Sequence, residues 1–116
     1  MKKFLAIYIG IPEAMDRWND LPEMEKASRQ KLGIEGWHAW ADKHKSAIVE
    51  MGGPLGRTKR IGKDGITDIR NAMTAYTLVA AESHQDAAKM FMDHPHFTFF
   101  PGEGIEVMEC MPIPGL

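Results

Sequence analysis

The clearest pattern of apolar and polar positions runs from residue 71 to residue 97. Residues 74–81 are rich in β-branched and aromatic side chains and contain no Gly or Pro, which predicts a mostly buried strand. Ser83 and Asp86 have the spacing of a helix N-terminal cap, so a helix is expected to begin at Ser83. Pro95 is expected to end that helix at the preceding residue. The prediction therefore places three candidate polar residues at a helix end: Asp93, His94 and His96.

The first third of the chain predicts one strand and one long helical region. Residues 3–9 carry apolar side chains at both odd and even positions, which is typical of a strand covered on both faces. Residues 13–20 are expected to be a polar connection, and a helix is expected from about Leu21 toward Leu32. Gly33 and Gly36 should weaken or break that helix. It is then expected to resume with an apolar stripe: Trp37, Trp40, Ala41, His44 and Ile48.

The second half predicts a glycine-rich segment, a hairpin and a last strand. Residues 52–56 contain three glycines and a proline, so they are expected to form a loop or a bulged strand. Asp64-Gly65 is a strong turn signal between two polar arms, 57–61 and 66–70, which should extend beyond the core. A final strand is expected over 105–111. The order of elements is β, α, β, β, α, β, which predicts an α+β, ferredoxin-like sandwich with both helices on one face of the sheet.

One face of this sheet would lack a cover. We expect the helices to screen Leu5, Ile7, Ile9, Ile105 and Val107. The opposite register would then present Phe4, Ala6, Tyr8, Met108 and Cys110 to solvent. An apolar surface of that extent is unfavourable for a monomer, so we predict a homodimer in which two sheets pack face to face.

Length, charge and cysteine content narrow the class of protein to which this chain can belong. The 116 residues, of 13.0 kDa, are expected to form a single domain, 1–116. The formal net charge of −2 and the pI near 6.2 give no general attraction to nucleic acid or to an anionic membrane. The lone Cys110 excludes an intrachain disulfide and indicates a reducing compartment, so we expect a cytoplasmic location. No apolar run approaches the roughly 20 residues of a membrane span.

Several short motifs, taken together, resemble one family. They are Gly53-Pro54-Leu55-Gly56-Arg57-Thr58-Lys59, Asp64-Gly65, Ala75-Tyr76-Thr77-Leu78, His96-Phe97 and Gly104-Ile105-Glu106-Val107. In this order and spacing they resemble YCII-related domains, and the branch called DGPF-like most closely. The resemblance spans roughly residues 37–111 and implies a dimeric α+β barrel made by two facing sheets.

The resemblance also implies a site built on a His-Asp pair. In the family, a helix histidine meets the aspartate of an Asp-Pro dipeptide. In this chain the dipeptide is His94-Pro95, so the aspartate is replaced by histidine or displaced to Asp93. The position of the helix histidine falls near Gly36 and not on His38. The resemblance therefore implies a fold more clearly than a reaction.

Candidate catalytic residues are His96, Glu106 and Asp93. The imidazole of His96 titrates near neutral pH, which suits proton transfer, although a hydrogen-bonded turn histidine is the alternative. Glu106 alternates with Ile105 and Val107 and would face the barrel interior, where burial raises a carboxyl pKa. Its alternative is an ion pair at the barrel rim. We expect His96 and Glu106 to share one cavity, with Phe97 and Phe99 as its apolar wall.

Candidate substrate-binding residues are more dispersed: Tyr8, His38, Trp40, Arg57, Lys59 and His94. The basic pair Arg57 and Lys59 would hold an anionic group, or else form a solvated hairpin that protects sheet edges. Tyr8 and Trp40 would line a pocket or belong to the core. The sequence predicts no cofactor and no metal, because Pro95 restricts the geometry of the His94 and His96 pair.

Two functions of different classes follow from these residues. One is an enzyme that acts on a small polar or anionic metabolite at the barrel mouth by general acid/base catalysis. The other is a non-catalytic module that binds a small molecule or a protein. The sequence leaves open the identity of the ligand and which histidine is functional.

Overall fold

The computed structural model describes residues 1–98, 100 and 102–115, and its main element is a four-stranded antiparallel sheet. The strands are ordered β2-β5-β1-β6, and a separate two-stranded sheet is made by β3 and β4. Their bounds are β1 Lys2–Ile9, β2 Ile48–Pro54, β3 Thr58–Gly62, β4 Gly65–Ile69, β5 Met73–Ala81 and β6 Gly104–Glu109.

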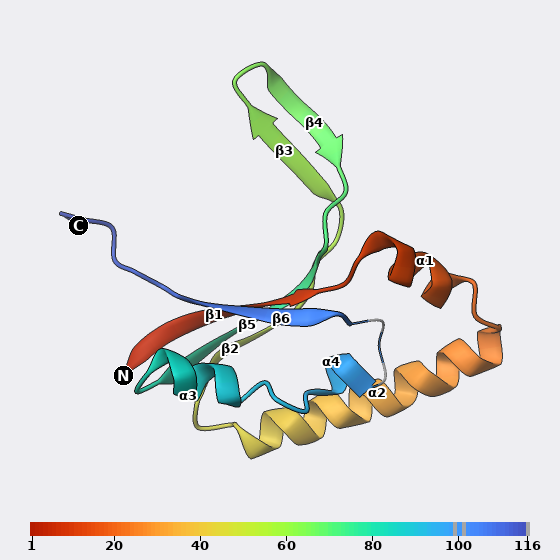
Figure 1. The fold of residues 1–116 in the computed structure, drawn as a ribbon, viewed down its shortest axis with the longest axis horizontal. Helices are drawn as coiled ribbons and strands as arrows, with labels where there is room; N and C mark the ends of the chain where they lie inside the picture. The colour runs from red at the N-terminus through yellow and green to blue at the C-terminus, as the bar shows by residue number, and fades with distance from the viewer. Residues whose placement is uncertain (99, 101, 116) are drawn as a thin grey trace.

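The helices lie along one face and at one end of the main sheet (Figure 1). Their bounds are α1 Pro12–Asn19, α2 Glu23–Lys43, α3 His84–Lys89 and α4 Pro95–Thr98. Figure 1 shows α2, α3 and α4 along one face, whereas the β3–β4 hairpin and the C-terminal tail rise on the opposite side. With the hairpin set aside, the strand order fits the ferredoxin-like arrangement, so the prediction of an α+β fold is confirmed.

The central strand β1 corrects the predicted faces of the sheet. Phe4, Ala6 and Tyr8 are 0% exposed and form the core beneath the helices, whereas the odd-numbered apolar residues of β1 are half-buried on the other face. The expectation that helices screen Leu5, Ile7 and Ile9 was therefore wrong. Both registers of this strand are apolar, so the period of two could not tell which one the helices cover.

The last strand follows the same register. Ile105 lies opposite Tyr8 and Val107 opposite Ala6, so both face the helices as expected. Glu106 lies opposite Ile7 and is exposed on the other face, because directly paired residues of neighbouring strands point the same way. We call this second surface the open face; it comprises Leu5, Ile7, Ile9, Tyr76, Leu78, Glu106 and Met108.

Two helical predictions were wrong for steric reasons. Residues 13–19 belong to helix α1, which has Asp20 as its C-cap, and Pro12 occupies the first turn, where its missing N–H costs nothing. Helix α2 runs unbroken through Gly33, where a Cβ would overlap the ring of Phe100. That glycine permits close packing and does not break the helix.

The helix after β5 begins as predicted and ends early. The Ser83 hydroxyl accepts a hydrogen bond from the backbone N–H of Asp86 at 3.1 Å, which confirms the N-cap. Helix α3 ends at Lys89, and Pro95 opens the short helix α4. His94 and His96 are thus held in and around α4, not at the end of α3.

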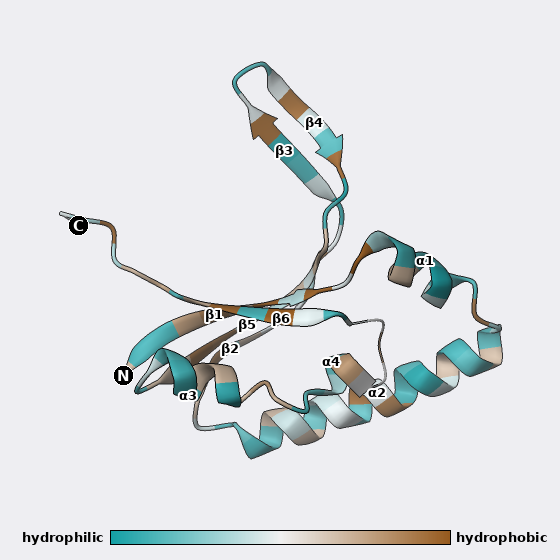
Figure 2. Cartoon of the chain, viewed as in Figure 1, coloured by the Kyte–Doolittle hydropathy of each residue, from teal (hydrophilic) through white to brown (hydrophobic). Residues whose placement is uncertain are grey.

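The middle of the chain supplies both a sheet strand and the predicted hairpin. Residues 48–54 form strand β2 with two register shifts against β5, so the bulged-strand alternative was right and Ile48 does not continue the helix. The hairpin turns at Lys63 and Asp64 as expected. Both of its strands show hydrophobic segments among hydrophilic ones (Figure 2).

Within the part of the chain that the structure describes, no helix is long and apolar enough to cross a membrane.

Candidate functional site

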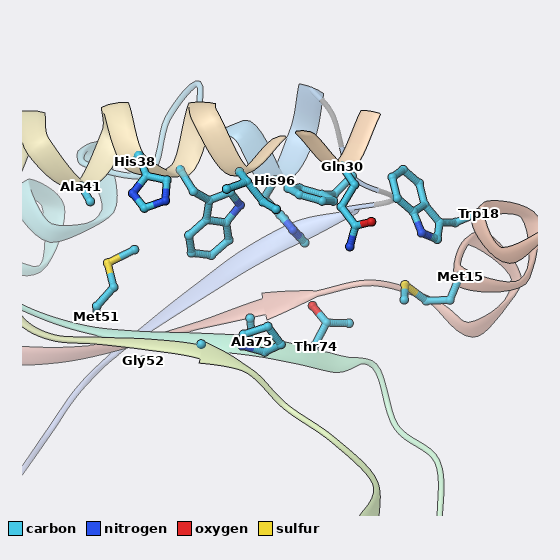
Figure 3. Close-up of a pocket in the computed structure, with 15 residues that line it drawn as sticks. Met15, Trp18, Gln30, His38, Ala41, Met51, Gly52, Thr74, Ala75 and His96 are labelled. Atoms are coloured by element: carbon cyan, nitrogen blue, oxygen red, sulfur yellow. The ribbon is translucent and has the colours of Figure 1, made fainter. Parts of the chain in front are cut away.

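A cavity of about 560 Å³ lies between helix α2 and the main sheet. Figure 3 shows Gln30 and His38 pointing from α2 toward the sheet, Met51 and Ala75 rising from the strands, and Trp18 of α1 at one end. The full lining comprises Met15, Trp18, Gln30, Ile34, Trp37, His38, Ala41, Met51, Gly52, Gly53, Pro54, Thr74, Ala75, His96 and Phe100.

The lining is apolar and aromatic, with few polar side chains. Gln30, His38, Thr74 and His96 supply these, and no Lys, Arg, Asp or Glu is among the described residues that line the cavity. A ligand with a full charge would lose its hydration there without gaining an ionic partner. The cavity therefore suits an uncharged molecule.

His96 is held in one tautomer. Its Nε2 lies 3.0 Å from the carbonyl oxygen of Ile9 and 3.1 Å from that of Gly104. Carbonyl oxygens only accept hydrogen bonds, so Nε2 carries the proton and donates to the ends of β1 and β6. In the neutral ring, Nδ1 is then the lone-pair acceptor.

The second ring nitrogen of His96, Nδ1, has no hydrogen-bond partner among the described residues. The residue is only 5% exposed and lines the cavity. Gly102 packs against the back of the ring, where a Cβ would overlap it.

Burial keeps this histidine neutral. Desolvation lowers the pKa of His96 below its usual 6.5, while the two carbonyl contacts act in the opposite direction and reduce the shift. Since the net change is downward, the imidazole is uncharged at neutral pH. The site thus presents a neutral base with a fixed orientation.

His94 supports His96 from behind. Its Nδ1 accepts a hydrogen bond from the His96 backbone N–H at 3.0 Å, so in the neutral ring Nε2 carries the proton. The ring is 0% exposed and packs edge-on against Trp37 and Trp40, at centroid distances of 4.5 and 4.7 Å. Burial, followed by repulsion from His96 and His44, lowers the pKa of His94 to about 3.

A chain of hydrogen bonds leads from His94 to the cavity floor. The Thr77 hydroxyl donates to the Met51 carbonyl at 2.9 Å, so it accepts from the Tyr8 hydroxyl at 3.0 Å. Tyr8 in turn accepts a long hydrogen bond of 3.4 Å from His94 Nε2. Burial raises the pKa of Tyr8 to about 12, so it remains a hydroxyl donor. The Met51 carbonyl and the His94 Nε2–H, at the two ends of this series, fix the direction of each hydrogen bond in it.

The structure brings together only some of the predicted site residues. His96 and His38 line the cavity, while Tyr8 and His94 lie buried directly behind it. Trp40 belongs to the core and donates its Nε1–H to the Met90 carbonyl at 2.8 Å.

The other predicted site residues lie elsewhere. Glu106 is on the open face, so it does not share a cavity with His96, contrary to the expectation. Asp93 is an exposed turn residue with φ of 61°. Arg57 precedes the hairpin and Lys59 lies on it, paired with Asp68 at 2.7 Å, so no basic group reaches the cavity. Phe99, expected in the apolar wall, lies outside the described residues, and Phe97 is half-exposed.

Sequence reasoning missed residues both in the cavity wall and behind it. Met15 and Trp18 were assigned to a loop, although their spacing of three would place both on one face of a helix. Thr77 gave no signal, because a threonine in an apolar strand is ordinarily a strand residue. Trp37 was recognised only as part of an apolar stripe.

The two histidines do not form a metal site with their neighbours. His94 Nδ1 and His96 Nε2 are both engaged in hydrogen bonds to the chain. Across residues 1–98, 100 and 102–115, no group of three or more His, Cys, Asp or Glu side chains is arranged to hold a metal ion.

The comparisons define the class of fold. No family model matches the chain, and no curated protein matches it. The domain is a mixed α+β fold built on an antiparallel sheet. Among solved structures it is similar to 5-chloro-2-hydroxyhydroquinone dehydrochlorinase (TftG) from Burkholderia phenoliruptrix in complex with 2,5-dihydroxybenzoquinone, with a TM-score of 0.53 and 18% sequence identity over 94% of this chain and 93% of that one. At that identity the likeness shows the fold alone.

Proposed function

We propose that this domain binds a small, planar, uncharged ring compound that carries a hydroxyl group, and that His96 Nδ1 accepts the hydroxyl proton as a general base. The observation that carries the proposal is a neutral histidine, fixed in one tautomer by Ile9 and Gly104, at the wall of an apolar cavity of about 560 Å³. Trp37 and Phe100 supply flat apolar surfaces for a ring. TftG, whose substrate is named as a hydroquinone, supports the same ligand class.

The described lining residues carry no formal charge, which narrows the predicted ligand class from a polar or anionic metabolite to an uncharged one. Arg57 and Lys59 do not line the cavity, and Glu106 is on the opposite face of the sheet. An anionic ligand has no partner among the described lining residues, so the uncharged class is favoured. The acid/base role then rests on His96 without Glu106.

The energetics limit what His96 can do. A phenolic hydroxyl has a pKa near 10, and the pKa of His96 is below 6.5, so complete proton transfer would cost at least about 5 kcal/mol. In the ground state Nδ1 therefore accepts a hydrogen bond. Transfer occurs only as negative charge on the ring is dispersed during a reaction, which is the role of a general base.

A binding experiment tests this proposal. Hydroquinone should quench the fluorescence of the tryptophans that line the cavity, whereas 1,4-dimethoxybenzene, which lacks the hydroxyl protons, and benzoate, which is anionic, should bind about tenfold more weakly or not at all. His96→Gln should weaken hydroquinone binding by about five- to tenfold, the value of one hydrogen bond. His38→Gln, in the same cavity, is the matched control and should change the affinity less than twofold.

Equal affinities for hydroquinone and its dimethyl ether, or an unchanged affinity in His96→Gln, would contradict the proposal. A second function, a non-catalytic binding module, is favoured by the absence of any carboxylic acid among the described lining residues, since the proton that His96 accepts has no obvious second carrier. Turnover of a bound ring compound would decide between the two.

Membership of the DGPF-like branch of YCII-related domains, a homodimer and a cytoplasmic location remain proposals.

A further inference from the structure

The β3–β4 hairpin stands away from the rest of the protomer. Its two strands pair with each other, and neither makes an extensive contact with another helix or strand of the described chain. Figure 1 shows the hairpin rising on the side of the main sheet that carries no helix. The radius of gyration is 16.0 Å, compared with about 13 Å for a compact domain of this size. The protomer alone gives the hairpin nothing to pack against.

The tip of the hairpin is apolar. Ile61 and Ile66 lie directly opposite each other in the register, so their side chains share one face. They are 77% and 67% exposed. A two-stranded hairpin is at best marginally stable in water, and an exposed isoleucine pair adds an unfavourable apolar surface. This tip is suited to burial against another surface.

The open face of the main sheet lies on the same side and has complementary properties. Leu5, Ile7 and Leu78 are half-buried there, so an apolar surface is available for a partner. Glu106 is exposed among them, and no ion pair engages it among the described residues.

Two charged residues of the hairpin are opposite in sign to Glu106. Arg60 and Lys63 are exposed on the hairpin and also make no ion pair within the described chain. A basic, apolar-tipped arm and an apolar sheet face that carries the exposed Glu106 therefore occur on one side of one protomer.

We propose that the hairpin is an exchanged arm: in a homodimer formed through the open faces, the β3–β4 hairpin of each protomer lies against the second copy, with Ile61 and Ile66 buried there and Arg60 and Lys63 near the acidic Glu106 of the partner subunit. Five-residue strands give the arm a length of about 16 Å, enough to reach across a substantial part of a partner sheet. The arrangement is isologous, because each copy gives one arm and receives one.

The arm acts apart from the cavity. The cavity lies between the sheet and α2, on the other side of the sheet. The proposal therefore stands or falls independently of ligand binding at His96.

Sedimentation velocity over a range of concentrations tests the exchanged arm. Ile61→Glu should raise the dimer dissociation constant at least tenfold, because it places a carboxylate in the buried tip contact. Met24→Glu is the matched control: Met24 is 87% exposed on α2, away from the hairpin, and its substitution should leave the constant within twofold of wild type. Since Ile61 is exposed in the protomer, both variants should keep the wild-type circular dichroism spectrum.

Charge reversal adds a second measurement. Arg60→Glu should weaken the dimer severalfold, and Glu106→Lys in the same chain should recover part of that loss, because the exchanged arm brings the two charges together only between protomers. A wild-type monomer, or a dimer whose constant is unchanged by both Ile61→Glu and Arg60→Glu, overturns the proposal. In the latter case the open faces pair without the arms.

Discussion

Two buried histidines show how position alone decides what an imidazole can do. His94 has both ring nitrogens committed, one to the His96 backbone and one to Tyr8, and its burial keeps it neutral. His96 has one nitrogen committed to two carbonyls, and its Nδ1 has no partner among the described residues. His94 therefore helps to hold His96 in place, whereas His96 keeps one ring nitrogen for the proposed ligand.

The burial of these histidines predicts loss of stability in mild acid. In the unfolded chain they titrate near pH 6.5, but in the folded protein the pKa of His94 is about 3 and that of His96 is also lowered. The unfolded state thus binds more protons below pH 6.5, so the contribution is fully present above that pH and is lost as the pH falls. Urea unfolding should show the free energy falling between pH 6.5 and pH 5, with a slope that approaches about 1.4 kcal/mol per pH unit from His94 and a further contribution from His96.

His94→Gln separates this effect from that of other groups. It should reduce the slope between pH 6.5 and pH 5 without abolishing it, because the lowered pKa of His96 still contributes. Thr67→Val, which removes no titratable group, should leave the slope as in wild type. A pH-independent free energy in the wild-type protein over this range would show that the histidines are not buried in the neutral form.

At the scale of elements, the cavity exists because α2 meets the sheet through small and aromatic residues. Gly33 lets Phe100 approach the helix backbone, and the bulges of β2 shift Met51 and Gly52 relative to β5. Gly52 has φ of 68° and lies against the Tyr76 carbonyl, where a Cβ would not fit. Gly33, expected to weaken or break a helix, and Gly52, expected in a loop or bulged strand, both help to shape the walls of the site.

The hydrogen bonds between β1, β5 and β2 predict the effect of one strand residue. Thr77→Val keeps the side-chain volume but leaves the buried Tyr8 hydroxyl without its acceptor and the Met51 carbonyl without its donor. We expect a loss of about 1–3 kcal/mol in the free energy of unfolding at pH 7, measured by urea denaturation. Thr67→Val, on the exposed hairpin strand β4, is the matched control and should change it by less than about 0.5 kcal/mol. Equal effects of the two substitutions would mean that the Tyr8–Thr77 hydrogen bond contributes nothing.

Local signals predicted the elements better than the surfaces they form. The Ser83 cap, the Asp64-Gly65 turn and the strand over 74–81 all depend on neighbours in sequence, and the structure confirms each of them. His96 could be proposed from its residue type and position, but its tautomer depends on Ile9 and Gly104, which meet it only in the folded chain. Glu106 was assigned to the same cavity because alternation fixes relative faces and not which face the helices take.

The reversed faces of β1 change how the whole molecule should be tested. Phe4 was predicted on the uncovered face, but it is fully buried and stacks on His84 at a centroid distance of 5.3 Å. A lysine at that position would unfold the protomer and would say nothing about assembly. The homodimer proposal therefore moves to the open face, whose central residue on β1 is Ile7.

Ile7→Lys is the substitution that tests the assembly of the open faces. Ile7 is half-buried between Tyr76 and Glu106 on neighbouring strands, so a lysine there can reach solvent in a monomer but would be desolvated between two sheets. Light scattering at micromolar concentration should give about twice the chain mass for the wild-type protein and the chain mass for Ile7→Lys, with an unchanged far-ultraviolet circular dichroism spectrum. Lys31→Ala, on the exposed surface of α2, is the control and should remain a dimer. A wild-type protein that scatters as a monomer would show that the half-buried apolar side chains of the open face need no partner.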